Sequence, residues 1–218
     1  MASGPCQGKM SVSPRLESSR KGAFLYHAVV SVFVMARLIG LYSPAPQSGK
    51  TFAANVLTQY GYRSMSFAEP IKRMAAEFIM SFGYTKDQAL RFVWADKEKE
   101  IAEIKTTARH ILQTLGTEWG RKCISNEIWT ECMMYRIASC LRDKDCSIVI
   151  DDVRFVNEAE TIKGMGGEMW MIIRPSATNS TKHESEGGLD KWEHFDHVII
   201  NDGTIADMRK KVDECAKC

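Results

Sequence analysis

Short apolar runs alternate with longer amphipathic segments along this chain from residue 37 onward. Most of the runs are continuously apolar, which is typical of strands buried on both faces of a parallel sheet. Five runs are predicted as strands, at residues 37–42, 63–67, 147–151, 168–173 and 197–200. Their alternation with helical segments predicts an α/β fold with a doubly wound, five-stranded parallel sheet flanked by helices.

Apolar positions at helical spacing predict the elements between these strands. Residues 50–60 form one helix directly after a glycine, and a second helix follows Pro70. The second helix carries its apolar face at Ile71, Met74, Ala75, Phe78, Ile79 and Phe82. Residues 85–142 are predicted to be helical throughout, with Thr107 as the N-cap of one helix. That helix is expected to present Ile111, Leu112, Leu115 and Trp119 on one face.

The first 34 residues differ from the rest of the chain. A polar stretch with several basic residues ends at Gly22, and a short apolar run follows over residues 23–34. This order resembles a signal peptide, but the run leads directly into the first predicted strand and is too short to span a bilayer. We therefore expect residues 1–34 to be a disordered or dispensable extension, and residues 35–218 to form the folded domain.

Composition narrows the classes of protein that fit. The chain has 218 residues, 44% of them hydrophobic, which is enough for one globular domain with a full core. Its formal net charge of +2 argues against a surface that coats nucleic acid polymers, and no further segment is apolar enough for a membrane helix. Seven scattered cysteines indicate reduced thiols and a cytoplasmic location. The oligomeric state, monomer or homodimer, stays open.

A candidate phosphate site follows the first predicted strand. Gly49-Lys50-Thr51 lies where a buried strand turns into a helix, which is the setting of a P-loop. The backbone at the glycine can approach phosphates, the lysine reaches the β- and γ-phosphates, and the threonine hydroxyl can bind Mg²⁺. The alternative is an ordinary turn with a solvated lysine. The strand before the motif and the helix after it favour phosphate binding.

A pair of acidic residues ends a later predicted strand. Asp151 and Asp152 would lie at the carboxyl edge of the sheet, where a carboxylate can hold Mg²⁺ through water or accept a proton from the acceptor. Arg154 follows them and would face a phosphate. The alternative is that the two acids cap the next helix or solvate a turn. Because the P-loop and the two acids occur in one chain, each motif makes the functional interpretation of the other stronger.

Six motifs occur in the order found in one enzyme family. They lie at residues 48–51, 66–72, 109–121, 151–158, 183–186 and 201–204. With them, residues 37–212 resemble the deoxynucleoside monophosphate kinases of tailed bacteriophages. This family belongs to the P-loop nucleoside monophosphate kinase superfamily, which also includes dephospho-coenzyme A kinase. The chain departs from the pattern at Pro44, which replaces the first glycine of the P-loop, and in its N-terminal extension.

The resemblance implies a reaction and a donor site. The reaction transfers the γ-phosphoryl group of ATP, with Mg²⁺ bridging the β- and γ-phosphates, to a dNMP, and gives ADP and a dNDP for phage DNA synthesis. The implied ATP-binding residues are Pro46, Gln47, Ser48, Gly49, Lys50, Thr51, Asn201 and Gly203. The implied metal ligands are Thr51 and Asp151, and the implied catalytic residues are Lys50, Asp151, Arg154 and Arg174.

The resemblance also implies an acceptor site in a helical insert over residues 85–142. Its implied residues are Lys72, Arg109, Gln113, Thr117, Arg121 and Asp152. Cations suit phosphoryl transfer between two anions, and the amide of Gln113 can both donate to and accept from a base edge. The stretch from Arg109 to Arg121 exceeds three helical turns, so both reach one nucleotide only if the helix bends or ends between them. Gly116 and Gly120 permit that.

A polar stretch over residues 174–194 resembles the lid of such kinases, which closes over the phosphates and excludes water. Arg174 is its candidate cation, whereas His183 is interpreted as a surface residue. Other polar runs give weaker evidence of function. Residues 96–100 are interpreted as a solvated helix face. The pairs at 194–197 and 215–218 make a Cys₂His₂ zinc site conceivable, but nothing fixes them near one another.

Two alternatives to this function stay open. One is a kinase for another small acceptor, as in dephospho-coenzyme A kinase. The other is a nucleotide-binding protein without catalysis, because the P-loop lacks its first glycine. A GTPase is disfavoured, since Asn201-Asp202 lacks the spacing of a guanine-reading motif.

Overall fold

The computed structural model describes residues 37–141, 146–177 and 188–217. The expected extension at residues 1–34 and the lid residue His183 lie outside the described residues. None of the described helices is both long and apolar enough to cross a bilayer.

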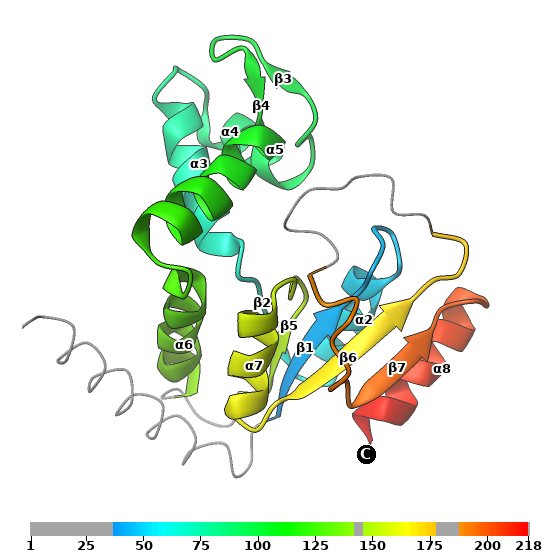
Figure 1. Cartoon of the computed structure of the whole chain (residues 1–218). Coiled ribbons are helices and arrows are strands. Elements are labelled where there is room, and N and C mark those ends of the chain that lie inside the picture. The colour runs from blue at the N-terminus through cyan, green and yellow to red at the C-terminus, as the bar shows by residue number, and fades with distance from the viewer. Residues whose placement is uncertain (1–36, 142–145, 178–187, 218) are drawn as a thin grey trace, which may run out of the picture.

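A five-stranded parallel sheet forms the centre of the molecule (Figure 1), with strands in the order β2-β5-β1-β6-β7. The strands are β1 (Leu38–Tyr42), β2 (Arg63–Met65), β5 (Ile148–Ile150), β6 (Glu168–Ile173) and β7 (His197–Ile200). The predicted fold class is therefore confirmed.

Three strands are shorter than predicted, and β1 begins one residue later than its predicted range. β2 ends two residues early, because the N–H groups of Phe67 and Ala68 donate to the carboxylate of Asp152 and not to a neighbouring strand. β5 loses one residue at each end of its predicted range.

Helices cover both faces of this sheet. The helices α2 (Lys50–Gln59) and α8 (Ile205–Ala216) pack on one face, and α6 (Ile128–Leu141) and α7 (Val156–Gly164) pack on the other. Each face of the sheet has its own hydrophobic core, and alternate residues of β1 point into one or the other. Ile39 and Leu41 belong to the core under α2 and α8, and Leu38 and Tyr42 belong to the core under α6 and α7. The fully buried β1 thus reads as a continuous apolar run.

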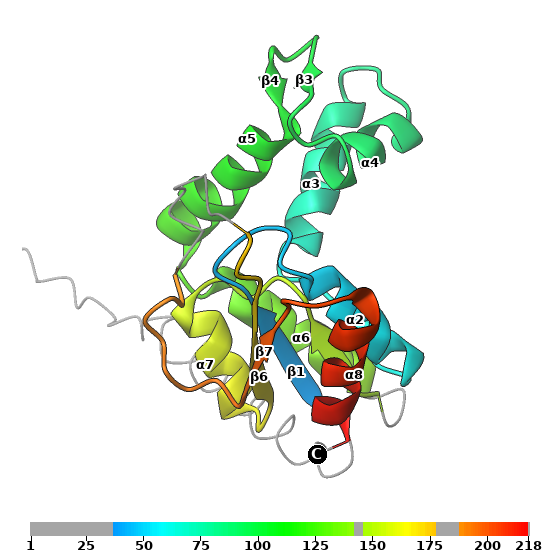
Figure 2. The ribbon, with the colours of Figure 1, turned by 90° about the vertical axis from the view of Figure 1, so that its right-hand side faces the viewer.

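An insertion rises above the carboxyl edge of the sheet (Figures 1 and 2). It comprises α3 (Glu69–Met80), α4 (Lys86–Trp94), β3 (Glu100–Ile101), β4 (Thr106–Thr107) and α5 (Ala108–Gln113). The prediction of helix throughout residues 85–142 is wrong here, since β3 and β4 form an antiparallel two-stranded ladder. These elements share a hydrophobic core of their own, formed by Ala75, Ala76, Ile79, Ala89, Val93, Ile101, Ala108 and Ile111.

The apolar face predicted for α3 is only half buried. Ile71, Ala75 and Ile79 are buried, whereas Met74, Phe78 and Phe82 are exposed. The small side chains of Ala75 and Ala76 form the contact with α4, so the flanking aromatic positions lie outside it.

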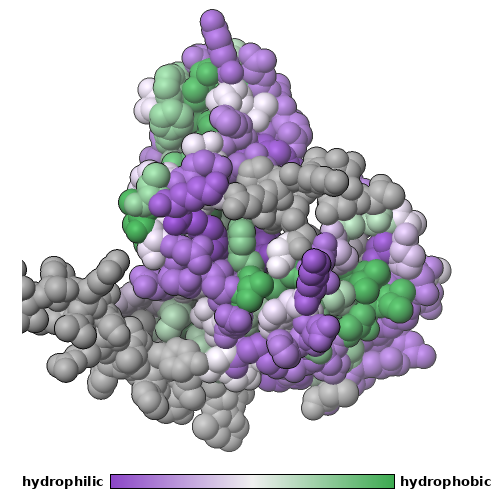
Figure 3. Space-filling model, viewed as in Figure 1, coloured by the Kyte–Doolittle hydropathy of each residue, from purple (hydrophilic) through white to green (hydrophobic). Residues whose placement is uncertain are grey.

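Figure 3 shows a second group of hydrophobic residues at the edge of the sheet where β7 lies, and Val198 and Ile200 are exposed there.

A π-helix, η1 (Thr114–Ile124), continues directly from α5. Thr107 caps α5 as predicted, its hydroxyl accepting from the His110 N–H at 3.2 Å. The wider π-helical turn changes which side chains face the core. Trp119, expected on the apolar face, is 42% exposed for this reason.

Two glycines adapt η1 to its neighbour α6. The indole N–H of Trp129 donates to the carbonyl of Gly116 at 2.8 Å. A Cβ at Gly120 would lie 2.5 Å from the ring of Trp129, so only glycine allows this approach. The break in regular helix expected at these glycines is thus a change to π-helix.

Candidate active site

The loop between β1 and α2 has the backbone that a phosphate site requires. Gln47 and Gly49 both have positive φ angles, 57° and 107°. A Cβ at Gly49 would also lie 2.8 Å from Nδ2 of Asn201, so glycine is required for two reasons. No described side chain caps α2, which leaves the N–H groups of its first turn for a ligand.

One buried hydroxyl in this loop points to an anionic ligand. Oγ of Ser48 is buried and has no hydrogen-bond partner within the described part of the chain. A buried polar atom without a partner is costly, and a phosphate oxygen would satisfy it. The donor set of the loop therefore fits a phosphate group.

Two predicted residues from other strands hold the loop from the side. Nδ2 of Asn201, directly after β7, donates to the carbonyl of Ser48 at 2.8 Å. The guanidinium of Arg174, directly after β6, lies 3.5 Å from the carbonyl of Gln47. A Cβ at Gly203 would lie 2.7 Å from Oδ2 of Asp207 in the first turn of α8, and Pro46 is exposed.

A cleft of about 340 Å³ lies between this loop, the carboxyl edge of the sheet and the insertion. It brings together ten of the predicted site residues: Lys50, Thr51, Lys72, Arg109, Gln113, Thr117, Arg121, Asp151, Asp152 and Arg154. The change from α5 to η1 lets both Arg109 and Arg121 face this one cleft. The other predicted residues lie around the phosphate loop or beyond it and do not line the cleft: Pro46, Gln47, Ser48, Gly49, Arg174, Asn201 and Gly203.

The two acids after β5 have different surroundings. The carboxylate of Asp152 accepts from Oγ of Ser66 at 2.7 Å and from the N–H groups of Phe67 and Ala68 at 2.8 and 2.9 Å. Both its oxygens are therefore engaged in fixing the start of α3. Asp151 lines the same cleft beside it.

Burial and the neighbouring Asp152 raise the pKa of Asp151, against the opposing effects of Lys72 and Lys50. A buried carboxylate that is short of positive charge favours a nearby cation. The oxygens of Asp151, together with the hydroxyl of Thr51, are the hard donors that Mg²⁺ prefers. The residues present thus fit a magnesium ion.

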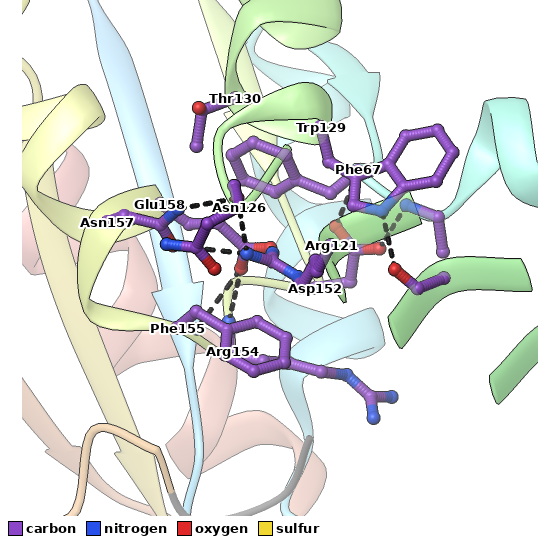
Figure 4. Close-up of polar contacts among 12 residues, drawn as sticks. Phe67, Arg121, Asn126, Trp129, Thr130, Asp152, Arg154, Phe155, Asn157 and Glu158 are labelled. Atoms are coloured by element: carbon purple, nitrogen blue, oxygen red, sulfur yellow. Dashed lines mark hydrogen bonds and ion pairs between the residues drawn. The ribbon is translucent and has the colours of Figure 1, made fainter. Parts of the chain in front are cut away.

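Arg121 forms a buried ion pair instead of standing free in the cleft (Figure 4). Its guanidinium donates to Glu158 at 2.5 Å, and the two side chains are 7% and 4% exposed. It also donates to the carbonyl of Asn126 at 3.1 Å and lies 3.8 Å from the ring centre of Phe155. These contacts favour a supporting role for Arg121 over direct contact with a ligand.

Glu158 extends this support to the backbone after β5. Its second oxygen accepts from the N–H groups of Arg154 and Phe155 at 2.8 and 3.2 Å. Burial raises the pKa of Glu158 to about 7, although Arg121 acts in the opposite direction. This role could not be predicted from residue type and position, because a glutamate near a helix start is typical of ordinary capping.

Four cations converge on the acceptor side of the cleft. Lys72, Arg109 and Arg154 all line it, and so does Lys97, which sequence analysis missed. Residues 96–100 are a turn that leads into β3, so their interpretation as a solvated helix face is wrong. Figure 4 shows the guanidinium of Arg154 pointing away from the Glu158 network.

The expected lid has one end anchored to the sheet. The hydroxyl of Tyr42, the last residue of β1, donates to Asp190, and its ring stacks on Phe195 with centroids 5.7 Å apart. Burial and the hydrogen bond to Asp190 raise the pKa of Tyr42. Residues 178–187 of the expected lid lie outside the described residues.

Within the described ranges, no three His, Cys, Asp or Glu residues are grouped so that they could hold a metal ion by themselves.

The model of the family described as deoxynucleotide monophosphate kinase matches residues 80–212 of this chain. The chain belongs to this family. The match spans most of the insertion together with β5, β6, β7 and most of α8. The phosphate loop precedes the matched residues, so its geometry is an independent observation.

Viral relatives of this kinase family agree with the match. A protein of Acanthamoeba polyphaga mimivirus, provisionally named deoxynucleotide monophosphate kinase, is 30% identical over 197 residues, which cover 82% of this chain and 95% of the relative. The deoxynucleotide monophosphate kinase of Escherichia phage RB69 is 27% identical over 106 residues, 49% of this chain and 43% of the phage protein. Among solved structures, dephospho-CoA kinase from Campylobacter jejuni is 16% identical with a TM-score of 0.45, covering 84% and 97% of the two chains. That likeness is too low to transfer a substrate.

Proposed function

We propose that this protein transfers the γ-phosphoryl group of ATP to a deoxynucleoside 5′-monophosphate. The observation that carries the proposal is one cleft lined by the lysine and threonine of a phosphate loop, by two acids, and by cations from the insertion and the segment after β5. A donor phosphate on one side and an acceptor phosphate on the other would meet at these acids. Membership of the deoxynucleotide monophosphate kinase family supports this division.

The donor half of the cleft suits the triphosphate of ATP. The first turn of α2, Lys50 and Ser48 would surround its phosphates, while Asn201 keeps the loop in shape through the carbonyl of Ser48. Arg174 lies beside the loop, where a cation would approach the γ-phosphate. Thr51 and Asp151 would hold Mg²⁺, which supplies charge neutralisation at the β- and γ-phosphate oxygens when bound.

The acceptor half suits a nucleoside monophosphate. Lys72, Arg109 and Arg154 would hold its phosphate, and Gln113 and Thr117 line the wall where the nucleoside would lie. Leu112, Phe67 and Trp129 supply apolar surface there. We assign Arg121 and Asp152 to support of this half, because their polar atoms are engaged by protein groups.

Phosphoryl transfer requires the protein mainly to position the two substrates and to neutralise their negative charge. An oxygen of the acceptor phosphate attacks the γ-phosphorus, and the bond from that phosphorus to the β–γ bridging oxygen breaks, leaving ADP. A monophosphate is largely dianionic at pH 7, so its oxygen attacks without a general base. The cations on both sides then stabilise the charge that spreads over the transferred group.

The deciding experiment measures ADP release with ATP, Mg²⁺ and a panel of acceptors. We expect turnover with at least one dNMP and none with dephospho-coenzyme A. Turnover only with dephospho-coenzyme A or another acceptor would support the first alternative, and ATP binding without turnover would support the inactive nucleotide-binding protein.

The same assay tests the phosphate loop. Lys50→Ala should lower turnover by about a hundredfold or more, because it removes one stabilising charge from the site. Its melting temperature should stay close to that of the unchanged protein, since Lys50 lies in the cleft and not in a hydrophobic core. Turnover at the unchanged rate would contradict the assignment of the loop.

A further inference from the structure

Lys97 occupies a position that is costly for a lysine. It is partly buried on the wall of the cleft, and its neighbours Lys72, Arg109 and Arg154 carry the same charge. Burial and these three cations lower the pKa of Lys97, and Asp152 alone among the contributing groups acts in the opposite direction. Asp152 is already satisfied by three donors from the protein.

No carboxylate in the described part of the chain forms an ion pair with Lys97. The acids beside it are engaged elsewhere: Glu98 with Arg109, and Asp96 with Arg91 at 2.8 Å. Of the four cations on this side of the cleft, Arg109 is paired with the exposed Glu98, whereas Lys97 has no ion-pair partner in the described ranges. A cluster of cations with such an unpaired lysine is the arrangement expected of a site for a multiply charged anion.

The backbone around Lys97 is built to hold it in place. The N–H of Arg109 donates to the carbonyl of Lys97 at 2.9 Å, which ties the turn to the start of α5. On the other side, the N–H groups of Asp96 and Lys99 donate to the carbonyls of Arg91 and Asp96 at 2.9 and 3.0 Å. The turn therefore positions two cations of the cleft at once, Lys97 directly and Arg109 through Glu98 and this backbone bond.

We propose that Lys97 binds the 5′-phosphate of the acceptor nucleotide, as a ligand delivered by the turn before β3. This inference rests on the proposed function. Lys97 belongs to the acceptor half because its charged neighbours come from α3, α5 and the segment after β5, whereas Lys50 of the phosphate loop is not among them. Asp151 is influenced by both Lys72 and Lys50, so this acid marks the boundary between the two halves.

The test compares Lys97→Met with Lys99→Met, a matched control at an exposed lysine two residues away that does not line the cleft. Loss of one charge-assisted contact to phosphate should raise the KM for the dNMP about ten- to hundredfold in Lys97→Met, with a much smaller change for ATP. Lys97→Arg should restore part of the loss. The Lys99 variant should behave as the unchanged protein.

A second readout separates a ligand from a structural residue. Because Lys97→Met removes a partly buried charge from a repelling cluster, its melting temperature should equal or exceed that of the unchanged protein. An unchanged KM for the dNMP, or equal losses for dNMP and ATP together with a lower melting temperature, would overturn the proposal.

Failure of the proposed function gives a different pattern. In that case the unchanged protein turns over no dNMP, and calorimetric titration of the same two variants with dNMP replaces the kinetics. Weaker binding of dNMP by Lys97→Met than by Lys99→Met would then support the phosphate ligand. Equal binding by the two variants, or none by the unchanged protein, would overturn it.

Discussion

At the scale of single residues, the candidate site separates groups that face the cleft from groups that hold them. Arg121 and Arg154 look alike in sequence, yet one is buried against Glu158 and the other points away from that pair. Residue type and spacing identify both as cations near a phosphate. Only the three-dimensional contacts show which of them already has an anionic partner.

The buried pair makes a stability prediction. Arg121→Ala should destabilise the fold by about 3–5 kcal/mol, because it leaves the carboxylate of Glu158 buried without its partner. The double variant Arg121→Ala with Glu158→Gln should recover part of this loss. Urea denaturation of the three proteins measures it. A stable Arg121→Ala variant with a raised KM for the dNMP alone would show instead that Arg121 is a direct ligand.

The lowered pKa of Lys97 makes a prediction about pH. Its charge is lost as pH rises through that pKa, which lies below the ordinary lysine value of about 10.4. The phosphate of the dNMP keeps a nearly constant charge well above its second pKa of about 6. With an acceptor whose base does not ionise in the alkaline range, the KM should therefore rise toward alkaline pH through loss of protein charge. Lys97→Arg should flatten this rise, because arginine stays protonated. An identical alkaline profile in both proteins would exclude Lys97 as its source.

At the scale of elements, the π-helix η1 is the feature that shapes the acceptor side. It starts where α5 ends, and it places Gly116, Thr117 and Arg121 on the cleft while Trp119 turns outward. Helical periodicity at 3.6 residues per turn cannot anticipate this change, since π-helix requires a different hydrogen-bond pattern. The glycines were a usable signal of irregularity, but not of its kind.

Two glycines of η1 should respond differently to substitution. Gly120→Ala places a Cβ 2.5 Å from the ring of Trp129 and should cost about 1–3 kcal/mol of stability. Gly116→Ala is the matched control, because its Cβ would meet only the flexible end of Ile71 at 3.3 Å. Chemical denaturation of both variants gives the comparison. Equal costs would mean that the Trp129 ring moves aside freely.

At the scale of the whole molecule, the parallel sheet was predictable, whereas the insertion was predictable only in part. Buried parallel strands read as continuous apolar runs, so β6 and β7 are found at their predicted residues. The ladder of β3 and β4 has two residues on each side, too few to produce a periodic signal. Its absence from the prediction hid Lys97, because residues 96–100 then read as a solvated helix. The phosphate loop was recognisable because its chemistry is local in sequence.

The expected dispensable extension makes a prediction for the whole chain. A protein that starts at Met35 should keep its melting temperature and its ADP release, because it retains Arg37. The guanidinium of Arg37 donates to Glu168 at 2.6 Å and to the carbonyl of Ala216 at 2.5 Å, which ties β1 to β6 and α8. A protein that starts at Leu38 lacks these bonds and should melt at a lower temperature. Loss of activity already at Met35 would show that the extension contributes to the fold.

The hydrogen bonds between Asp152 and the start of α3 determine where the insertion would pivot. The root through which the chain enters the insertion lies where the carboxylate of Asp152 accepts hydrogen bonds from Ser66, Phe67 and Ala68, directly beside Asp151. In any rotation of the insertion about this root, the distal β3–β4 ladder sweeps through a wide arc while atoms near the pivot barely move. Such a rotation would leave the carboxylate of Asp151 almost in place, because Asp151 lies next to the pivot.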